Sequence, residues 1–156
     1  MTSLNDLHTG YAMQGRIDER APVRNTSSIE IDAPAEKVWA LLSDLRGWER
    51  WWPEHKVLDL GAITPGATFR WRLGGVRIRS RFAVVTEGRE LTWSGVVLGV
   101  YKAVDRNLVE ALPGGRTRVT ISESLAGPLA GLLYPAAKLR VGHERFLTAI
   151  KKEAEK

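Results

Sequence analysis

The chain has 156 residues, of which 44% are hydrophobic, and its formal net charge is +5. These values predict one globular domain with a sizeable core, and the 23 basic and 18 acidic residues are spread along the chain. The absence of cysteine excludes disulfides, thiolate metal sites and thiol nucleophiles, so we expect a cytoplasmic protein. No apolar run approaches the ~20 residues of a transmembrane segment, and we expect no secretory signal.

The first segment of the chain is polar and shows no clear hydrophobic period. It contains two glycines and a proline, which favour irregular structure. We therefore predict a flexible extension over residues 1–25 and a single domain over residues 26–156.

The predicted domain begins with a strand and two short helices. Residues 27–32 alternate between polar and apolar side chains, which is typical of a half-buried strand. Residues 33–45 have a helical apolar face, and Pro34 suits the first turn of that helix. The tryptophans at 48, 51 and 52 have helical spacing, which predicts a second short helix that ends before Pro53.

The hydrophobic period then changes from helical spacing to two. Alternation over residues 56–125 predicts six strands, and glycine- and proline-containing turns occur at residues 63–66, 74–75 and 113–115. Short turns between consecutive strands predict an antiparallel meander, which with the first strand makes about seven strands.

The last segment, residues 127–156, has the pattern of a long amphipathic helix. Pro128 suits its first turn, and Pro135 is expected to kink or restart it. We predict that its apolar stripe packs on the sheet, and this stripe contains Leu129, Leu132, Leu133, Ala136, Leu139, His143, Leu147, Ile150 and Ala154.

Several segments match a known superfamily in order. Ile-Glu-Ile-Asp-Ala-Pro-Ala-Glu-Lys-Val-Trp-Ala-Leu-Leu-Ser-Asp-Leu at 29–45 and Trp-Glu-Arg-Trp-Trp-Pro at 48–53 resemble the START-like (SRPBCC, helix-grip) superfamily. Gly-Ala-Thr-Phe-Arg-Trp at 66–71 and Thr-Ile-Ser-Glu-Ser-Leu-Ala-Gly at 120–127 also fit. Within it, the chain looks most like the polyketide cyclase/dehydrase and lipid-transport family.

The resemblance implies an α+β helix-grip fold, in which a curved antiparallel sheet wraps around a long C-terminal helix and leaves a cavity between them. The glycine-rich loop of the plant-allergen and hormone-receptor branch is missing, because the corresponding turn is only residues 63–66. This departure argues against the plant hormone-binding mode.

The inward positions of the predicted sheet combine large and small side chains. Trp71, Trp93 and Tyr101 are large, whereas the residues at 80, 95 and 103 are Ser80, Gly95 and Ala103. This mixture is compatible with a ligand cavity and equally with a tightly packed core.

A set of polar residues shares the same inward positions, namely Asp105, Asn107, Glu123, Arg140 and His143. Carboxylates are seldom buried without partners, so a polar cluster is expected here. We expect at least two of Asp105, Glu123, Arg140 and His143 to meet, with Asp105 and Glu123 in diagonal or water-mediated contact rather than directly opposed. Asp105, Glu123 and His143 are the catalytic candidates if the protein is an enzyme, and a purely structural cluster is the alternative.

Other site types have weaker signals. Five arginines, at 70, 72, 77, 79 and 81, alternate along one predicted hairpin and suit either a solvated convex face or an anionic partner. No metal or nucleotide motif occurs, so we expect no cofactor, no metal and no nucleic-acid partner.

Three functions remain open. The first is binding or transport of an apolar small molecule, lipid-like or aromatic and polyketide-like. The second is a polyketide aromatase/cyclase or dehydratase that uses the same cavity. The third is an interaction domain similar to chaperone activators. The sequence leaves the ligand, catalysis and a homodimer open.

Overall fold

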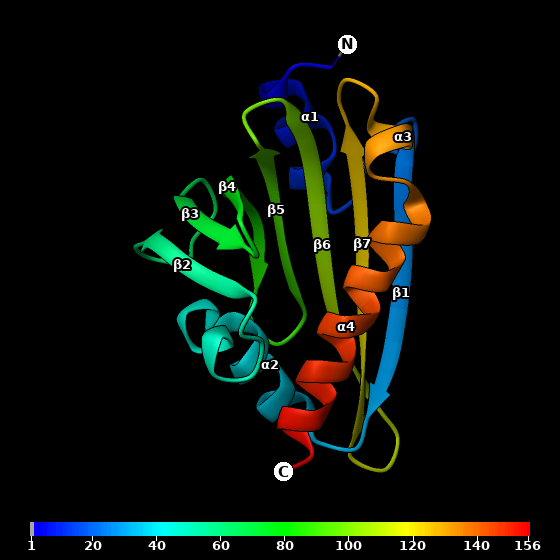
Figure 1. The fold of residues 1–156 in the computed structure, drawn as a ribbon. Coiled ribbons are helices and arrows are strands. Elements are labelled where there is room, and N and C mark those ends of the chain that lie inside the picture. Colours follow the sequence, from blue (N-terminus) through cyan, green and yellow to red (C-terminus); the bar gives the residue numbers. More distant parts are fainter. Residues whose placement is uncertain (1) are drawn as a thin grey trace.

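The computed structural model describes residues 2–156 and contains one seven-stranded sheet with helices on both faces (Figure 1). Its strands are β1 (Val23–Ile31), β2 (His55–Leu60), β3 (Thr68–Leu73), β4 (Val76–Thr86), β5 (Glu90–Val97), β6 (Tyr101–Leu112) and β7 (Arg116–Ala126). Its α-helices are α1 (Leu4–Gly10), α2 (Ala35–Ser43), α3 (Ala130–Leu133) and α4 (Ala136–Ala154), and its 3-10 helices are η1 (Ala12–Gln14) and η2 (Leu45–Arg50).

The sheet is antiparallel throughout and has the order β1-β7-β6-β5-β4-β3-β2. Strands β2 to β7 form the meander that the alternation predicts, and β1 pairs with β7. Figure 1 shows α4 lying across the concave side of the curved sheet. The predicted helix-grip fold, including the two short helices after the first strand, is confirmed.

Aromatic side chains join the short helices to α4. The Trp48 side chain is 2% exposed, and its ring centroid lies 4.9 Å from that of Phe146. Its indole Nε1–H donates to the carbonyls of Leu41 and Leu42, so the buried polar atom is satisfied. This packing closes one end of the concave core.

The C-terminal segment forms two helices, α3 and α4, so the expected restart at Pro135 is confirmed. Pro135 has extended backbone (φ −60°, ψ 155°) between α3 and α4, because its ring disfavours continuation of the preceding helix. The stripe is confirmed at His143, Leu147 and Ile150, which are buried. The expectation that the stripe includes Leu132 is wrong, since that side chain is 75% exposed. The other parts of the predicted stripe that are exposed are Leu129, Leu133 and Ala136.

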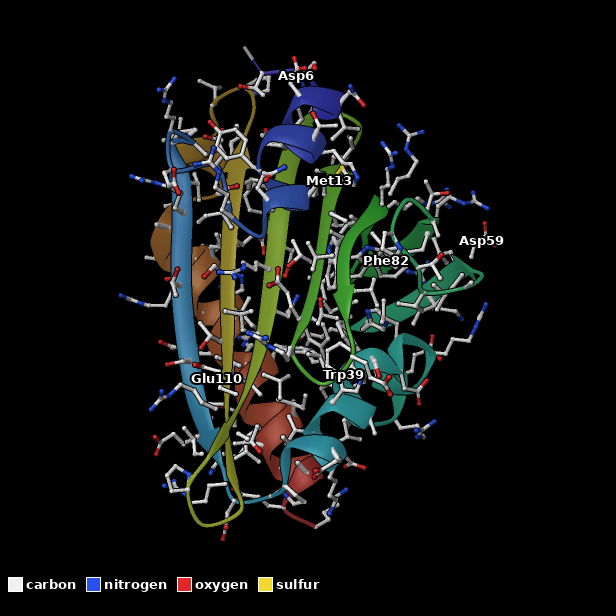
Figure 2. The ribbon with its side chains drawn as sticks, turned by 180° about the vertical axis from the view of Figure 1, so that it is seen from behind. Asp6, Met13, Trp39, Asp59, Phe82 and Glu110 are labelled. Atoms are coloured by element: carbon white, nitrogen blue, oxygen red, sulfur yellow. The ribbon has the colours of Figure 1, made fainter. Side chains whose placement is uncertain are left out.

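The N-terminal segment also differs from its prediction. Instead of a flexible extension, α1 and η1 pack on the convex face of the sheet, which faces the viewer in Figure 2. Leu7 and Ala12 form a small core with Ala83 and Val104. Ser3 caps α1 by accepting from the Asp6 amide at 3.1 Å. Strand β1 begins at Val23, so the boundary expected at residue 26 is too late.

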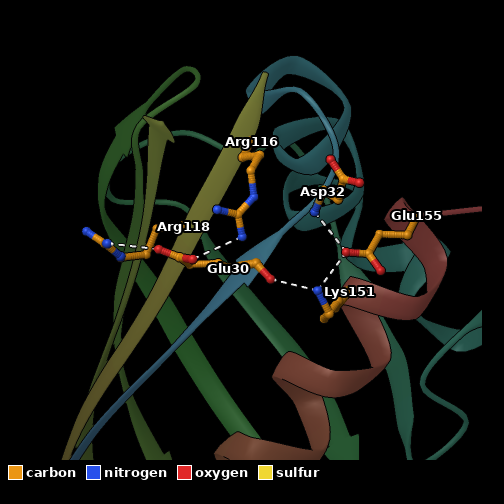
Figure 3. A network of polar contacts seen from close by, with 6 residues as sticks. All are labelled: Glu30, Asp32, Arg116, Arg118, Lys151 and Glu155. Carbon is orange, nitrogen blue, oxygen red and sulfur yellow. Dashed lines mark hydrogen bonds and ion pairs between the residues drawn. The ribbon is translucent and has the colours of Figure 1, made fainter. Parts of the chain in front are cut away.

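A network of charged side chains ties the end of α4 to β1 (Figure 3). Glu30 accepts from Arg116 at 3.0 Å and from Arg118 at 3.1 Å. Lys151 donates to the Glu30 carbonyl at 2.8 Å and to Glu155 at 2.7 Å. Because these groups are exposed, their ion pairs contribute little to the free energy of folding. The network links the last turns of α4 to β1 and β7.

We expect Leu147→Ala to lower the free energy of unfolding by about 2–5 kcal/mol, because this side chain on α4 is fully buried in the main core. Leu132→Ala is the matched control and should change it by less than about 0.5 kcal/mol. Chemical denaturation of both variants measures the difference. Equal effects would contradict the placement of the two side chains.

Candidate functional site

A cavity of about 320 Å³ lies between α4 and the concave face of the sheet. Its walls are mainly apolar and aromatic, which is the usual character of a small-molecule pocket. The residues around it include Trp48, Trp52, Trp71, Ile78, Ser80, Trp93, Gly95, Tyr101, Ala103, Asp105, Asn107, Ile121, Glu123, Leu125, Tyr134, Leu139, His143 and Phe146.

The open space follows from one row of small residues across the sheet. Ser80 pairs with Gly95, and Gly95 pairs with Ala103, so three adjacent strands present almost no side chain at this level. Trp71 lies beside this row and donates its Nε1–H to Ser80 Oγ at 3.0 Å. A Cβ added at Gly95 would lie 2.8 Å from the same Ser80 oxygen. Ser80, Gly95 and Ala103 all line the cavity, so the small residues leave open space rather than a filled core.

The next row along the strands is polar. It runs from Trp93 on β5 through Asp105 on β6 and Glu123 on β7 to Asn25 on β1, and each residue is the direct partner of the next. The expectation of a diagonal arrangement of Asp105 and Glu123 is therefore wrong. In an antiparallel pair, directly opposed Cβ atoms are about 4.5–5.5 Å apart, which lets the two carboxyl groups interact.

His143 comes down from α4 onto this polar row. Its Nε2 lies 2.9 Å from Glu123 Oε1, and its Nδ1 lies 2.9 Å from Asn25 Nδ2. The exposed fraction is 9% for the His143 side chain and 17% for the Glu123 side chain. Asn107 donates to Asp105 Oδ1 at 2.8 Å. We call Asp105, Glu123, His143 and Asn25 the polar cluster.

Burial and neighbouring charge change the protonation of the polar cluster. Burial, together with the charge of Glu123, raises the pKa of Asp105 to about 8. Asp105 therefore keeps its proton at neutral pH and can act as a hydrogen-bond donor. Burial alone would lower the pKa of His143, but the hydrogen bond and charge of Glu123 outweigh it and raise that pKa.

The Asn25 amide can accommodate both forms of His143. When the imidazole is neutral with Nε2–H directed at Glu123, its Nδ1 accepts from Asn25 Nδ2. When the ring is charged, both nitrogens donate, and rotation of the amide by 180° presents Asn25 Oδ1 instead. Ser27 Oγ, 2.9 Å from Asn25 Nδ2, can exchange its donor and acceptor roles accordingly. The cluster can thus gain or lose a proton without leaving a buried group unpaired.

The structure places eight of the nine expected site residues on the cavity wall, namely Trp71, Ser80, Trp93, Tyr101, Asp105, Asn107, Glu123 and His143. The expected placement of Arg140 is wrong. Its side chain is 59% exposed and lies 3.9 Å from Glu144 on the outer side of α4. A position three residues from His143 is rotated by about 60° around the helix, which is enough to turn Arg140 away.

Two contributors were missed from the sequence. Asn25 falls within the predicted extension over residues 1–25, although the alternation that places Ile29 and Ile31 inward includes it when continued toward the N-terminus. Phe146 is 4% exposed and lines the cavity, one helical turn from His143. Its ring packs against Trp48, Trp51 and Trp52, and the residue spacing in the sequence does not predict this contact.

Among residues 2–156, no group of three or more His, Asp or Glu side chains is arranged so that it could hold a metal ion. None of the helices described for these residues has the length and apolarity needed to cross a membrane.

Solved structures with the same fold are numerous. A hypothetical protein from Helicobacter pylori has a TM-score of 0.75 at 19% identity, covering 88% of this chain and 91% of that one. A START superfamily protein from Mycobacterium smegmatis has a TM-score of 0.68 at 17% identity, covering 85% and 97%. The Zhui aromatase/cyclase from a Streptomyces species has a TM-score of 0.67 at 21% identity, covering 85% and 93%. At these identities the likeness concerns the fold alone.

No curated protein matches the sequence. The family described as polyketide cyclase/dehydrase and lipid transport matches residues 22–155, from the start of β1 to the end of α4. Because this match spans nearly the whole chain, the protein belongs to the polyketide cyclase/dehydrase and lipid-transport family.

Proposed function

We propose that the protein binds an apolar small molecule, lipid-like or aromatic, in the cavity under α4. The observation that carries this proposal is an apolar, aromatic cavity that ends on one partly buried polar cluster. Family and fold support a ligand-binding or cyclase-type role in such a cavity. In this proposal the polar cluster orients the ligand. We also expect the protein to be located in the cytoplasm.

The polar cluster favours a neutral polar group on the ligand. Protonated Asp105 can donate a hydrogen bond, and the Glu123 carboxylate can accept one. A ligand hydroxyl or carbonyl group can use either partner. A ligand carboxylate would add negative charge beside Glu123 and is therefore disfavoured.

We expect a polyaromatic alcohol or a sterol to bind more tightly than a fatty acid of similar size. The measurement is quenching of tryptophan fluorescence, since Trp71 and Trp93 line the cavity. Ala103→Leu should weaken binding by at least about tenfold, because it fills the row of small residues. The matched control is Ala149→Leu on the outer side of α4, which should bind normally. Unchanged binding by the Ala103 variant would place the ligand elsewhere.

We expect the raised pKa of Asp105 to make stability fall as pH rises from 7 to 9. The folded state holds this proton up to a pKa of about 8, whereas the unfolded chain releases it near 3.8, so unfolding releases a proton in this window. Relative to Asp105→Asn, which mimics the protonated acid, the wild type should lose roughly 1 kcal/mol. Denaturation at both pH values tests this, and a parallel response of the two proteins would contradict it.

A second candidate function is a proton-transfer enzyme of the cyclase or dehydratase type. The observation that favours it is an acid and a base in one cluster, since Asp105 holds a proton while Glu123 is paired with His143. Dehydration requires protonation of a leaving hydroxyl group and removal of a proton from the neighbouring carbon, and this pair of roles is available here. The apolar cavity between α4 and the sheet favours both candidates over a chaperone-activator-like interaction domain.

If the cluster transfers protons, the protein should accelerate exchange of the acidic C–H of an aryl 1,3-diketone with deuterated water. Glu123→Gln should reduce the exchange rate by more than it reduces affinity, because the base is lost while the hydrogen bond to His143 can remain. Proton NMR measures the rate and fluorescence measures the affinity. If the diketone binds without exchange above the background rate, the protein is a binder of such molecules rather than an enzyme acting on them.

A further inference from the structure

Exposed aliphatic side chains gather on two segments beside the cavity. Leu98 and Val100, in the turn between β5 and β6, are 53% and 52% exposed. Leu129, Leu132 and Leu133, at α3, are 67%, 75% and 49% exposed. The two segments are joined by a hydrogen bond of 3.0 Å from Tyr101 Oη to the Pro128 carbonyl. Since Tyr101 and Tyr134 line the cavity, the five aliphatic residues lie beside this end of it, and we call them the leucine rim.

Two residues of the leucine rim have a costly backbone conformation. Leu98 and Leu129 both have φ 54°, and they are the two non-glycine residues with positive φ among residues 2–156. A leucine there is disfavoured by contact of its Cβ with the backbone, whereas glycine or asparagine is tolerated. Neither side chain regains this cost through burial, because both are more than half exposed. A strained, exposed leucine is therefore best explained by a contact outside the folded chain.

Basic side chains lie next to the rim. The Arg77 carbonyl accepts from the Leu98 amide at 3.3 Å, so the Arg77 backbone lies beside the rim, and Lys138 lines the cavity. The side chains of Arg77 and Arg79 alternate with the cavity-lining Ile78 and Ser80, so they leave the convex face of the sheet at this edge. Arg72 is directly opposite Arg77, and Arg70 is directly opposite Arg79, although like charges at opposed positions repel each other. Of the arginines on the β3–β4 hairpin, only Arg70 forms an ion pair within residues 2–156, with Asp59 at 3.8 Å. Arg77 and Arg79 are thus available to an external anion, whereas Lys138 Nζ lies over the Tyr134 ring, 5.3 Å from its centroid.

We propose that the leucine rim and the adjacent arginines dock on the surface of an anionic lipid bilayer. The leucines would enter the interfacial region while the arginines face anionic headgroups. Leucine and valine are under-represented among the residues that dominate protein–protein interfaces, so this composition fits lipid better than a protein partner. Docking there would place this end of the cavity against the membrane. Transfer of a ligand between the membrane and the cavity rests on the proposed function, whereas docking on the membrane does not.

The test is co-sedimentation of the ligand-free protein with vesicles. We expect binding to vesicles containing one-third phosphatidylglycerol, little binding to pure phosphatidylcholine, and a loss of binding at high salt. Leu98→Asn combined with Leu129→Asn should weaken binding at least tenfold. Because asparagine tolerates positive φ, the same variant should unfold at an equal or higher temperature. The matched control is Val141→Gln, which changes an exposed valine on the outer side of α4.

A second pair of variants tests the charge. Arg77→Glu should weaken binding to anionic vesicles, whereas Lys152→Glu, with the same change of charge on the outer side of α4, should have little effect. The proposal is overturned if the wild type does not sediment with anionic vesicles, or if the leucine variant binds them normally. Loss of self-association in the leucine variant, without vesicle binding by the wild type, would instead identify an interface between copies. Ala103→Leu, which fills the cavity, should leave vesicle binding intact, so the docking and cavity proposals fail separately.

Discussion

A carboxylate under a helix has to be paired or protonated, and the contact between Glu123 and His143 meets this requirement at the centre of the molecule. Glu123 lies on β7, next to β1 and β6 in the sheet, and His143 lies on the face of α4 directed at the sheet. Asp105 is close enough to Glu123 that the two carboxyl groups cannot both be charged without cost, so Asp105 keeps its proton. The Glu123–His143 contact therefore links the position of α4 over the sheet to the protonation of Asp105.

The sequence predicts much of this arrangement because one face of the sheet is mainly apolar and the other mainly polar along most strands. Alternation places Trp71, Trp93 and Asp105 on the same side, and a short turn between consecutive strands leaves few alternatives to an antiparallel meander. Resemblance to the family adds the helix that covers this side. The alternation therefore predicts which strand residues face α4, whereas Asn25 and Phe146 lie outside what it predicts.

The remaining features depend on details that periodicity does not contain. Whether Asp105 and Glu123 are opposed depends on how the loop at residues 113–115 closes, and two glycines with φ 81° and 72° allow the tight closure that aligns them. Arg140 is rotated by about 60° around α4 from the inward His143. Its side chain therefore points outward, where it lies 3.9 Å from Glu144. The packing of α1 is a tertiary effect, since a helix of seven residues has little stability of its own.

Helix α1 lies outside the segment that matches the family, yet it completes the convex side of this sheet. His8, 2% exposed, places its Nδ1 2.6 Å from Ser94 Oγ, and the Asp18 amide donates to Ser124 at 3.1 Å. A chain trimmed to begin at residue 22 would expose Ala83 and Val104 in the middle of the sheet and remove both of these hydrogen-bond partners. Such a chain would expose an apolar patch on the convex face and would be prone to aggregation. The boundary of the family match is therefore a poor guide to the unit that folds.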